Sequence, residues 1–124
     1  MEWFERLSGN ETARQVTGAA GEAQALAYLQ DQGLMLIQQN FRCKTGEIDL
    51  IMRDGQTLVF VEVRARTDNR YGGAAASVTP AKQRRLIRAA QFYLQRFRAL
   101  PPCRFDVVAI DAGAIDWLKN AIEA

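Results

Sequence analysis

The feature that most constrains the fold of this chain is a pair of β-type runs joined by the dipeptide Asp54-Gly55. The segment, residues 46–66, reads GEIDLIMRDGQTLVFVEVRAR. An Asp-Gly pair between alternating apolar residues is the strongest short-range signal for a two-residue hairpin turn. Residues 47–53 and 57–65 are therefore predicted to form two neighbouring antiparallel strands.

The same segment places charged side chains inside strands that otherwise look buried. A buried carboxylate loses hydration worth several kcal/mol unless positive charge meets it. With the turn at the Asp-Gly pair, alternation predicts one wholly apolar face and one face with an acidic cluster. That register would place Glu47 opposite Glu62 and Asp49 opposite Phe60. The expected faces are Glu47, Asp49, Ile51, Phe60, Glu62 and Arg64 on the acidic side, and Ile48, Leu50, Met52, Val59, Val61 and Val63 on the apolar side.

Two of these acids are predicted to lie close enough to bind one cation. Opposed or diagonal residues on neighbouring strands have Cβ atoms about 5–8 Å apart, which lets Asp49 and Glu62 reach a common ion. A hard divalent cation such as Mg²⁺ or Mn²⁺ suits such oxygen ligands. Without a cation, Glu47 and Glu62 should repel each other. The alternative is that this face is wet and that Arg64 and neighbouring arginines neutralise the acids.

The first part of the chain is predicted to place a helix before this hairpin. Apolar residues at helical spacing indicate a helix over residues 18–32, with Glu22 near its start and Gly33 as its C-cap. A first-turn glutamate commonly serves the helix dipole, so Glu22 alone indicates no function. Residues 34–43 are apolar without a helical period and are predicted to be extended.

The second half of the chain is predicted to contain one helix and two strands. Thr79-Pro80 has the pattern of a helix start, with proline at the first helical position. The expected segments are a loop over 68–80, a helix to about residue 99, strands over 104–110 and 115–118, and a short helix or frayed tail to Ala124. The first fifteen or so residues are expected to be loosely ordered. The order is αβββαβ plus an extra strand, and 124 residues fit a single domain over residues 1–124.

The absence of histidine narrows the chemistry that this chain can perform. It excludes Ser-His-Asp and Cys-His nucleophile systems and histidine-containing zinc or iron sites. Cys43 and Cys103 form no CxxC pair, so we expect reduced thiols. The first residues lack the apolar run of a signal peptide, and no segment approaches the roughly 20 apolar residues of a membrane span. We therefore expect a cytoplasmic protein without a membrane partner.

Positive charge is concentrated in one stretch, although the net charge is only +2. Between Asp68 and Asp106 all charged residues are basic, and such a block attracts polyanions with a strength that falls with salt. Arg84, Arg88 and Arg98 share one side of the predicted helix and are candidates for binding nucleic acid. The simpler interpretation is a solvated helix face. The block consists of Arg70, Lys82, Arg84, Arg85, Arg88, Arg96, Arg98 and Arg104.

The combined motifs resemble a known pattern. An Asp on one hairpin strand and Glu-x-Lys on the next, preceded by a helical Glu, is the signature of the PD-(D/E)XK nuclease superfamily, whose core is αβββαβ. More closely, GEIDLIMRDGQTLVFVEVRAR, YGGAAASVTPAKQRRLIRAAQFYL and RFDVVAI together resemble the YraN family of uncharacterised bacterial proteins, related to Holliday-junction resolvases. The resemblance covers residues 18–116. It implies a restriction-endonuclease-like α/β core with a mixed sheet flanked by helices, metal-dependent hydrolysis of DNA, branched DNA as a candidate substrate, and a homodimer.

The resemblance also implies roles for particular residues. It assigns Glu22 as the accessory carboxylate, Asp49 as the central metal ligand and Glu62 as the second ligand, joined by the carbonyl of Val63. The implied ion is Mg²⁺ or Mn²⁺. In phosphodiester hydrolysis such an ion activates water and stabilises charge on the phosphate. Glu47 remains an alternative to Glu22 as a ligand.

The chain departs from the superfamily pattern at one position, where Arg64 stands in place of lysine. A guanidinium keeps its proton, so Arg64 can clamp a phosphate but cannot serve as a base. Lys82 is a candidate for the missing amine, and its alternative is an ordinary solvent-exposed charge. Two functions therefore stay open: a metal-dependent nuclease-like enzyme, and a non-catalytic nucleic-acid-binding or protein-interaction module with the same fold.

Overall fold

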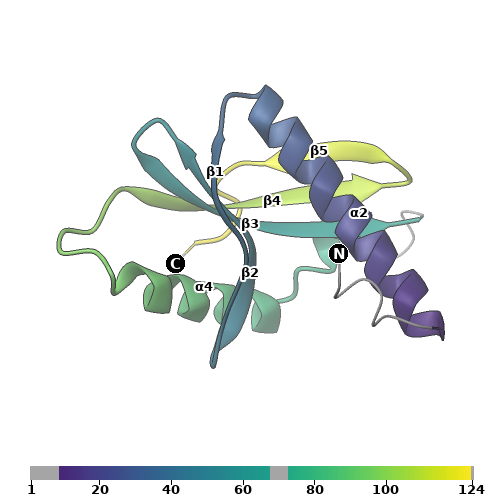
Figure 1. Cartoon of the computed structure of the whole chain (residues 1–124), viewed down its shortest axis with the longest axis horizontal. Helices are drawn as coiled ribbons and strands as arrows, with labels where there is room; N and C mark the ends of the chain where they lie inside the picture. The colour runs from purple at the N-terminus through teal and green to yellow at the C-terminus, as the bar shows by residue number, and fades with distance from the viewer. Residues whose placement is uncertain (1–8, 68–72, 124) are drawn as a thin grey trace.

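A five-stranded mixed sheet with helices on both faces organises the chain (Figure 1). The computed structural model describes residues 9–67 and 73–123. Its elements are α2 (Gly9–Asp31), β1 (Met35–Cys43), β2 (Gly46–Asp54), β3 (Thr57–Arg66), α3 (Gly73–Ala76), α4 (Pro80–Leu94), β4 (Cys103–Asp111) and β5 (Ala114–Leu118). The strands follow the order β1-β2-β3-β4-β5, and only β3 and β4 run parallel. This confirms the expected α/β class and is consistent with a restriction-endonuclease-like core.

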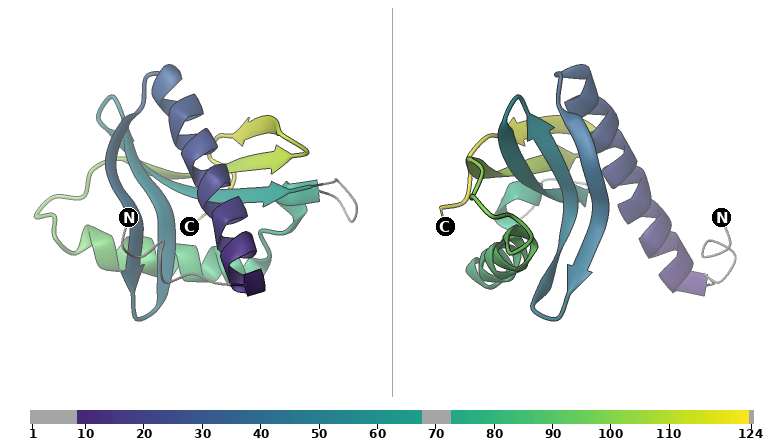
Figure 2. Two further views of the ribbon diagram at one scale, coloured as in Figure 1. Left: turned by 45° about the vertical axis from the view of Figure 1, so that its right-hand side comes forward. Right: turned by 60° about the vertical axis from the view of Figure 1, so that its left-hand side comes forward.

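The two faces of the sheet bury separate apolar clusters. α4 packs on the cluster that contains Ile51, Phe60 and Phe105. α2 packs on the cluster that contains Leu50 and Val61. The right-hand view of Figure 2 shows the two helices on opposite sides of the β1–β2 hairpin. The parallel β3–β4 pair requires a crossover, and α3 and α4 provide it.

The helices differ from the sequence expectation mainly in their ends. α2 begins at Gly9 rather than at residue 18, so part of the stretch expected to be loosely ordered is helical, whereas residues 1–8 lie outside the described range. Gly33 has a φ of +97° and ends the helix as expected. Thr79 caps α4 by accepting a hydrogen bond from the Lys82 amide at 3.3 Å. α4 ends at Leu94, short of residue 99 and well before Pro101, and at this end the Gln95 amide donates to the Phe92 carbonyl at 3.2 Å.

The register of the central hairpin differs from the prediction. The two turn residues are Gly55 and Gln56, and Asp54 pairs with Thr57 inside the ladder. Gly55 has a φ of +61° and takes the first turn position, where a type II′ turn favours glycine. The carboxylate of Asp54 is held in the strand by Arg104, at 3.1 Å. The ladder is therefore displaced from the one that a turn at Asp54-Gly55 would give.

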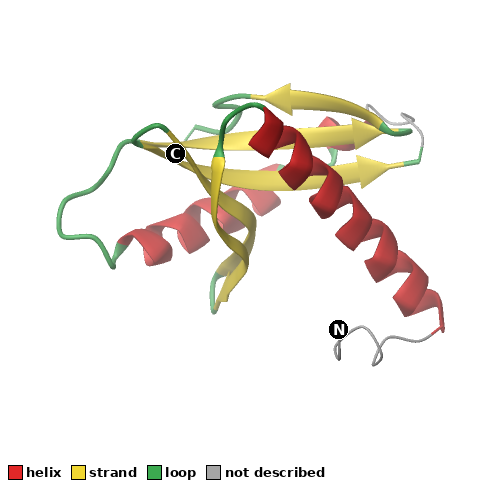
Figure 3. Ribbon diagram, turned by 45° about the horizontal axis from the view of Figure 1, so that its top comes forward, coloured by secondary structure: helices red, strands yellow, loops and turns green. Residues whose placement is uncertain are grey.

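The first half of β2 separates from β3. Their pairing runs only from Leu50–Val61 to Asp54–Thr57, so the predicted oppositions of Glu47 with Glu62 and of Asp49 with Phe60 are wrong. Ile48 packs with the α4-side cluster rather than with Leu50, which shows that regular alternation breaks here. β1 stays paired with β2 along its length, apart from a bulge between Leu36 and Gln38. Figure 3 shows this hairpin twisting away from the other three strands.

Two further segments differ from the expectation. The stretch predicted as a loop contains the short helix α3, and the amide of its second residue, Ala74, donates to Asp111 Oδ1 at 2.7 Å. Residues 68–72 of that loop lie outside the described range. The C-terminal segment is neither a helix nor a frayed tail, since Ala121 donates to the Phe105 carbonyl at 2.8 Å and Ile122 is buried.

Candidate active site

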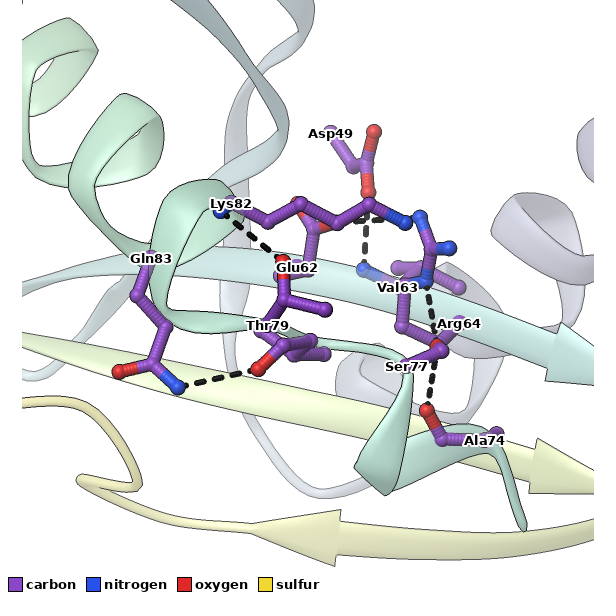
Figure 4. A network of polar contacts seen from close by, with 10 residues as sticks. Asp49, Glu62, Val63, Arg64, Ala74, Ser77, Thr79, Lys82 and Gln83 are labelled. Carbon is purple, nitrogen blue, oxygen red and sulfur yellow. Dashed lines mark hydrogen bonds and ion pairs between the residues drawn. The ribbon is translucent and has the colours of Figure 1, made fainter. Parts of the chain in front are cut away.

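The point where β2 leaves β3 is the place where the two central acids meet. Asp49 Oδ2 accepts a hydrogen bond from the Val63 amide at 2.8 Å (Figure 4). A side chain thus replaces the backbone partner that β2 would otherwise offer to β3. Glu62 directly precedes Val63 on β3, and its carboxyl lies within hydrogen-bond reach of the Asp49 carboxyl. The divergence of the strands, rather than direct opposition in a ladder, brings the two acids together.

Both carboxyls are difficult to ionise in this position. Burial, the negative charge of Asp49 and further nearby acids raise the pKa of Glu62 from 4.5 to about 8, against the opposing effect of Arg64. Burial also raises the pKa of Asp49, although the Val63 hydrogen bond acts in the opposite direction. Only 14% of the Glu62 side chain is exposed. The site therefore concentrates negative charge that the described side chains balance incompletely.

Arg64 is anchored beside this pair. Its Nη1 lies 3.5 Å from Glu62 Oε2, and its Nε donates to the Ser77 hydroxyl at 2.9 Å. Ser77 in turn donates to the Ala74 carbonyl at 2.6 Å, which connects the guanidinium to α3. The side chain is thus held in one orientation by a chain of hydrogen bonds, with the guanidinium beside the acids.

Lys82 approaches the same point from the first turn of α4. Its side chain extends over Glu62 toward the guanidinium of Arg64 (Figure 4). Burial and the positive charge of Arg64 lower the pKa of Lys82, and Glu62 acts in the opposite direction. The structure therefore places an amine near Glu62 although position 64 holds an arginine.

The two remaining candidate acids lie further from the pair. Burial, followed by the charges of Asp49 and Glu47, raises the pKa of Glu22 on α2 from 4.5 to about 7. Glu47 is exposed at the rim and forms an ion pair with Arg42 at 3.3 Å. Across the described part of the chain, no three acidic or cysteine side chains gather in a group that could hold a metal ion. The charge of Asp49 thus acts on the pKa of Glu22, and the role of Glu22 as a ligand stays a prediction.

A cleft of about 510 Å³ opens beside the acids. One wall is the β1–β2 turn, the other is the first part of α4, and Glu62 and Arg64 lie between them. Basic residues outnumber acidic ones along its surface. The lining residues are Arg42, Cys43, Lys44, Thr45, Gly46, Glu47, Glu62, Arg64, Lys82, Arg85 and Leu86.

The basic block predicted from the sequence is divided among different environments. Arg84, Arg88 and Arg98 are exposed, but none of them lines the cleft, and Arg98 lies beyond the end of α4. Arg96 covers the Tyr93 ring, with 3.8 Å between the guanidinium carbon and the ring centre. Of the other members of the basic block, Lys82 and Arg85 line the cleft and Arg104 binds Asp106. Arg70 lies outside the described residues.

The donor set suits a hard divalent cation. Asp49 and Glu62 supply carboxylate oxygens from neighbouring strands, and a cation between them would relieve the repulsion by which Asp49 raises the pKa of Glu62. Mg²⁺ is usually bound by one or two carboxylates, with water and substrate phosphate completing its shell. A third acidic side chain is therefore not required. The predicted carbonyl ligand at Val63 belongs to the residue whose amide already holds Asp49.

Some residues of the site were not found from the sequence. Ser77 fixes Arg64, and Lys44 and Arg85 line the cleft. No sequence pattern assigned any of the three to the site, because each lies in a segment predicted as a loop, a turn or a basic block. Lys44 sat in an expected turn and Arg85 in a general basic block. The position of the β1–β2 turn against α4 is tertiary information that no local pattern contains.

Comparison with known proteins finds a matching family model and several similar relatives. Residues 21–110 match the model of "Uncharacterised protein family UPF0102". The chain is 67% identical to a UPF0102 protein of Herminiimonas arsenicoxydans over 118 residues, 95% of each chain. It is 66% identical to one of Janthinobacterium sp. (strain Marseille), over 91% of this chain and 92% of the relative. A UPF0102 protein of Cupriavidus metallidurans is 58% identical, over 92% and 84% respectively.

Proposed function

Since the chain belongs to the uncharacterised protein family UPF0102, as its resemblance to YraN proteins indicated, we propose a function from the site itself: metal-dependent, nuclease-like hydrolysis of DNA phosphodiester bonds. The observation that carries this proposal is the meeting of Asp49 and Glu62 in a half-buried position beside a cleft rich in basic residues. Strongly perturbed acids in a cleft are typical of functional sites. Branched DNA remains a candidate substrate because of the resemblance to Holliday-junction resolvases.

Asp49 and Glu62 would hold Mg²⁺ or Mn²⁺, with the Val63 carbonyl as a further ligand. Such an ion lowers the pKa of bound water and stabilises negative charge on a reacting phosphate. Its binding requires both carboxyls to be ionised, so binding near neutral pH would release protons from the pair. The Val63 amide keeps Asp49 oriented throughout, because it donates to the oxygen Oδ2.

The cationic side chains have separate tasks in this proposal. Arg64, fixed by Ser77 and Glu62, presents its guanidinium to a phosphate oxygen. Lys82, whose side chain lies near Glu62, is placed to orient water. Glu22, whose pKa is raised to about 7 by burial and by the charge of Asp49, is placed to exchange protons near neutral pH.

A cleavage assay tests this proposal. Purified protein at low salt would be incubated with single-stranded, duplex and branched DNA in Mg²⁺ or Mn²⁺. Cleavage should fall at least about 100-fold in Asp49→Asn and Glu62→Gln, since each change removes a charged ligand. Arg53→Gln, which removes an exposed charge outside the cleft, is the matched control. No cleavage of any substrate with either ion would reject the enzyme. A mass measurement on the same samples tests the implied homodimer.

One observation favours a second candidate, a non-catalytic nucleic-acid-binding module. Arg64 cannot act as a base, and its Nε and Nη1 are already bonded to Ser77 and Glu62. A binding module would keep its affinity for DNA after Asp49→Ala and would cleave none of the substrates. A protein-interaction module would show neither affinity nor cleavage.

A further inference from the structure

Lys44 and Arg85 stand on opposite walls of the cleft as unmatched positive charges. Within the described residues, Arg42 is paired with Glu47 and Arg64 with Glu62, whereas no acidic side chain lies at ion-pair distance from Lys44 or Arg85. Both side chains are exposed, and both line the cleft. Two cations without an acidic partner among the described residues are available to an external anion.

The two walls that carry these cations are in direct backbone contact. A Cβ atom added at Gly46 would lie 2.6 Å from the Arg85 carbonyl oxygen, so the β1–β2 turn and α4 meet closer than any other residue allows. Lys44 is two residues before this contact and Arg85 is part of it. The packing of the fold therefore fixes the spacing of the two backbone segments that carry the cations, which reduces the cost of bringing Lys44 and Arg85 together around a ligand.

The cleft lacks the aromatic side chains that commonly bind nucleic-acid bases by stacking. Its lining contains no aromatic side chain on which a base could stack. Its volume of about 510 Å³ lies in the range of pockets that take one small ligand, about 300–1,000 Å³. A duplex can lie only across such an opening, whereas a single strand can enter it. Repeated phosphates are the ligand that matches a cleft lined by Lys44, Arg85 and Glu62, where a bound cation would add positive charge.

We propose that the cleft binds one strand of nucleic acid through its phosphates, with Lys44 of the β1–β2 turn and Arg85 of α4 as contacts. This inference rests on the proposed function for its class of ligand, but it names different residues from the exposed arginines of α4. It implies binding without base preference. It also implies that a single strand binds more tightly than a duplex, whereas a merely basic surface would favour the duplex because of its higher charge density.

The test is equilibrium binding of a fluorescent single-stranded oligonucleotide across a range of salt concentrations. Ca²⁺ replaces Mg²⁺, since it takes the same oxygen ligands, and gel analysis checks that the oligonucleotide stays intact. Lys44→Gln and Arg85→Gln should each weaken binding roughly fivefold at low salt. Each should also reduce the slope of log K against log[salt] by about 0.7, the value for one phosphate contact on a single strand. Arg53→Gln should change neither quantity.

Three outcomes would overturn the inference. The first is unchanged binding in both cleft variants, and the second is a duplex that binds more tightly than the single strand. The third is a larger loss in Arg88→Gln than in the cleft variants, which would move the binding surface to the exposed side of α4. The nuclease proposal fails separately: wild-type protein that binds strands through Lys44 and Arg85 but cleaves none would refute the enzyme and keep the inference.

Discussion

The sheet contains two sites with buried or partly buried acids, and they differ in how fully hydrogen bonds and positive charge compensate those acids. At one, Asp106 on β4 is fully buried and has a partner for each oxygen. Arg104 Nε donates to it at 3.0 and 3.2 Å, Trp117 Nε1 donates at 3.0 Å, and the Asn120 amide donates at 2.8 Å. Arg104 also reaches Asp54 at 3.1 Å. This site stabilises the junction of β4, β5 and the C-terminal segment.

At the other site, two acids face each other with less compensation. Asp49 receives the Val63 amide, and Glu62 contacts Arg64 at the longer distance of 3.5 Å. Burial raises the pKa of both acids, to which Glu47 adds at Asp49 and the charge of Asp49 adds at Glu62. Local conflicts of this kind are expected at functional positions. The contrast indicates that the Asp106 site serves the fold, and it supports our proposal that the Asp49–Glu62 site binds a cation.

The largest effect on stability is expected at the structural site. Asp106→Ala would leave Arg104 without its buried partner and two N–H donors unsatisfied, which costs about 3–5 kcal/mol. Urea unfolding of the wild type and of Asp106→Ala would measure this loss. A loss below about 1 kcal/mol would mean that the two acidic sites do not differ in the way described.

A divalent cation should act on the other site alone. Binding to the folded state would raise the free energy of unfolding by about 2.7 kcal/mol at a free ion concentration of 100 times Kd. Unfolding followed with and without Mn²⁺ measures this increase, which should disappear in Asp49→Asn. An increase of the same size in Asp49→Asn would place the ion elsewhere.

The third effect concerns pH. Because the pKa of Glu62 is raised from 4.5 to about 8, the folded state binds more protons than the unfolded state between these values, and stability falls as pH rises through them. Glu62→Gln should remove this contribution and stabilise the metal-free protein at pH 8, where each unit of pKa difference corresponds to about 1.4 kcal/mol. Parallel stability curves of the wild type and Glu62→Gln from pH 5 to pH 8 would contradict the account.

Much of the fold followed from local patterns. Alternation correctly grouped Ile51 with Phe60 and Leu50 with Val61, and the Thr79-Pro80 pair correctly marked the start of α4. These features depend on neighbours in the sequence. The order of helices and strands, the short fifth strand and the family could therefore be predicted from the sequence. Among the described residues, no helix has the length and apolar character needed to cross a bilayer.

The details of the site depended on contacts distant in sequence. The turn position could not be derived locally, because Asp54 is held in its strand by Arg104, 50 residues further along the chain. The predicted ladder likewise missed that Asp49 uses its side chain to replace a backbone partner of Val63. The cleft arises only where the β1–β2 turn packs against α4 at Gly46. Asp49 and Glu62 could be nominated from sequence, but not the path by which they meet.

The most direct measurement is a crystal structure of the protein soaked in Mn²⁺, with the ion located by its anomalous signal. The account predicts a single strong peak about 2.0–2.4 Å from oxygens of both Asp49 and Glu62. It also predicts that this peak is absent from Asp49→Asn crystals treated in the same way. A soaked wild-type crystal without density between the two carboxylates, or with the ion bound at another place, would contradict the claim that this pair exists to hold a cation.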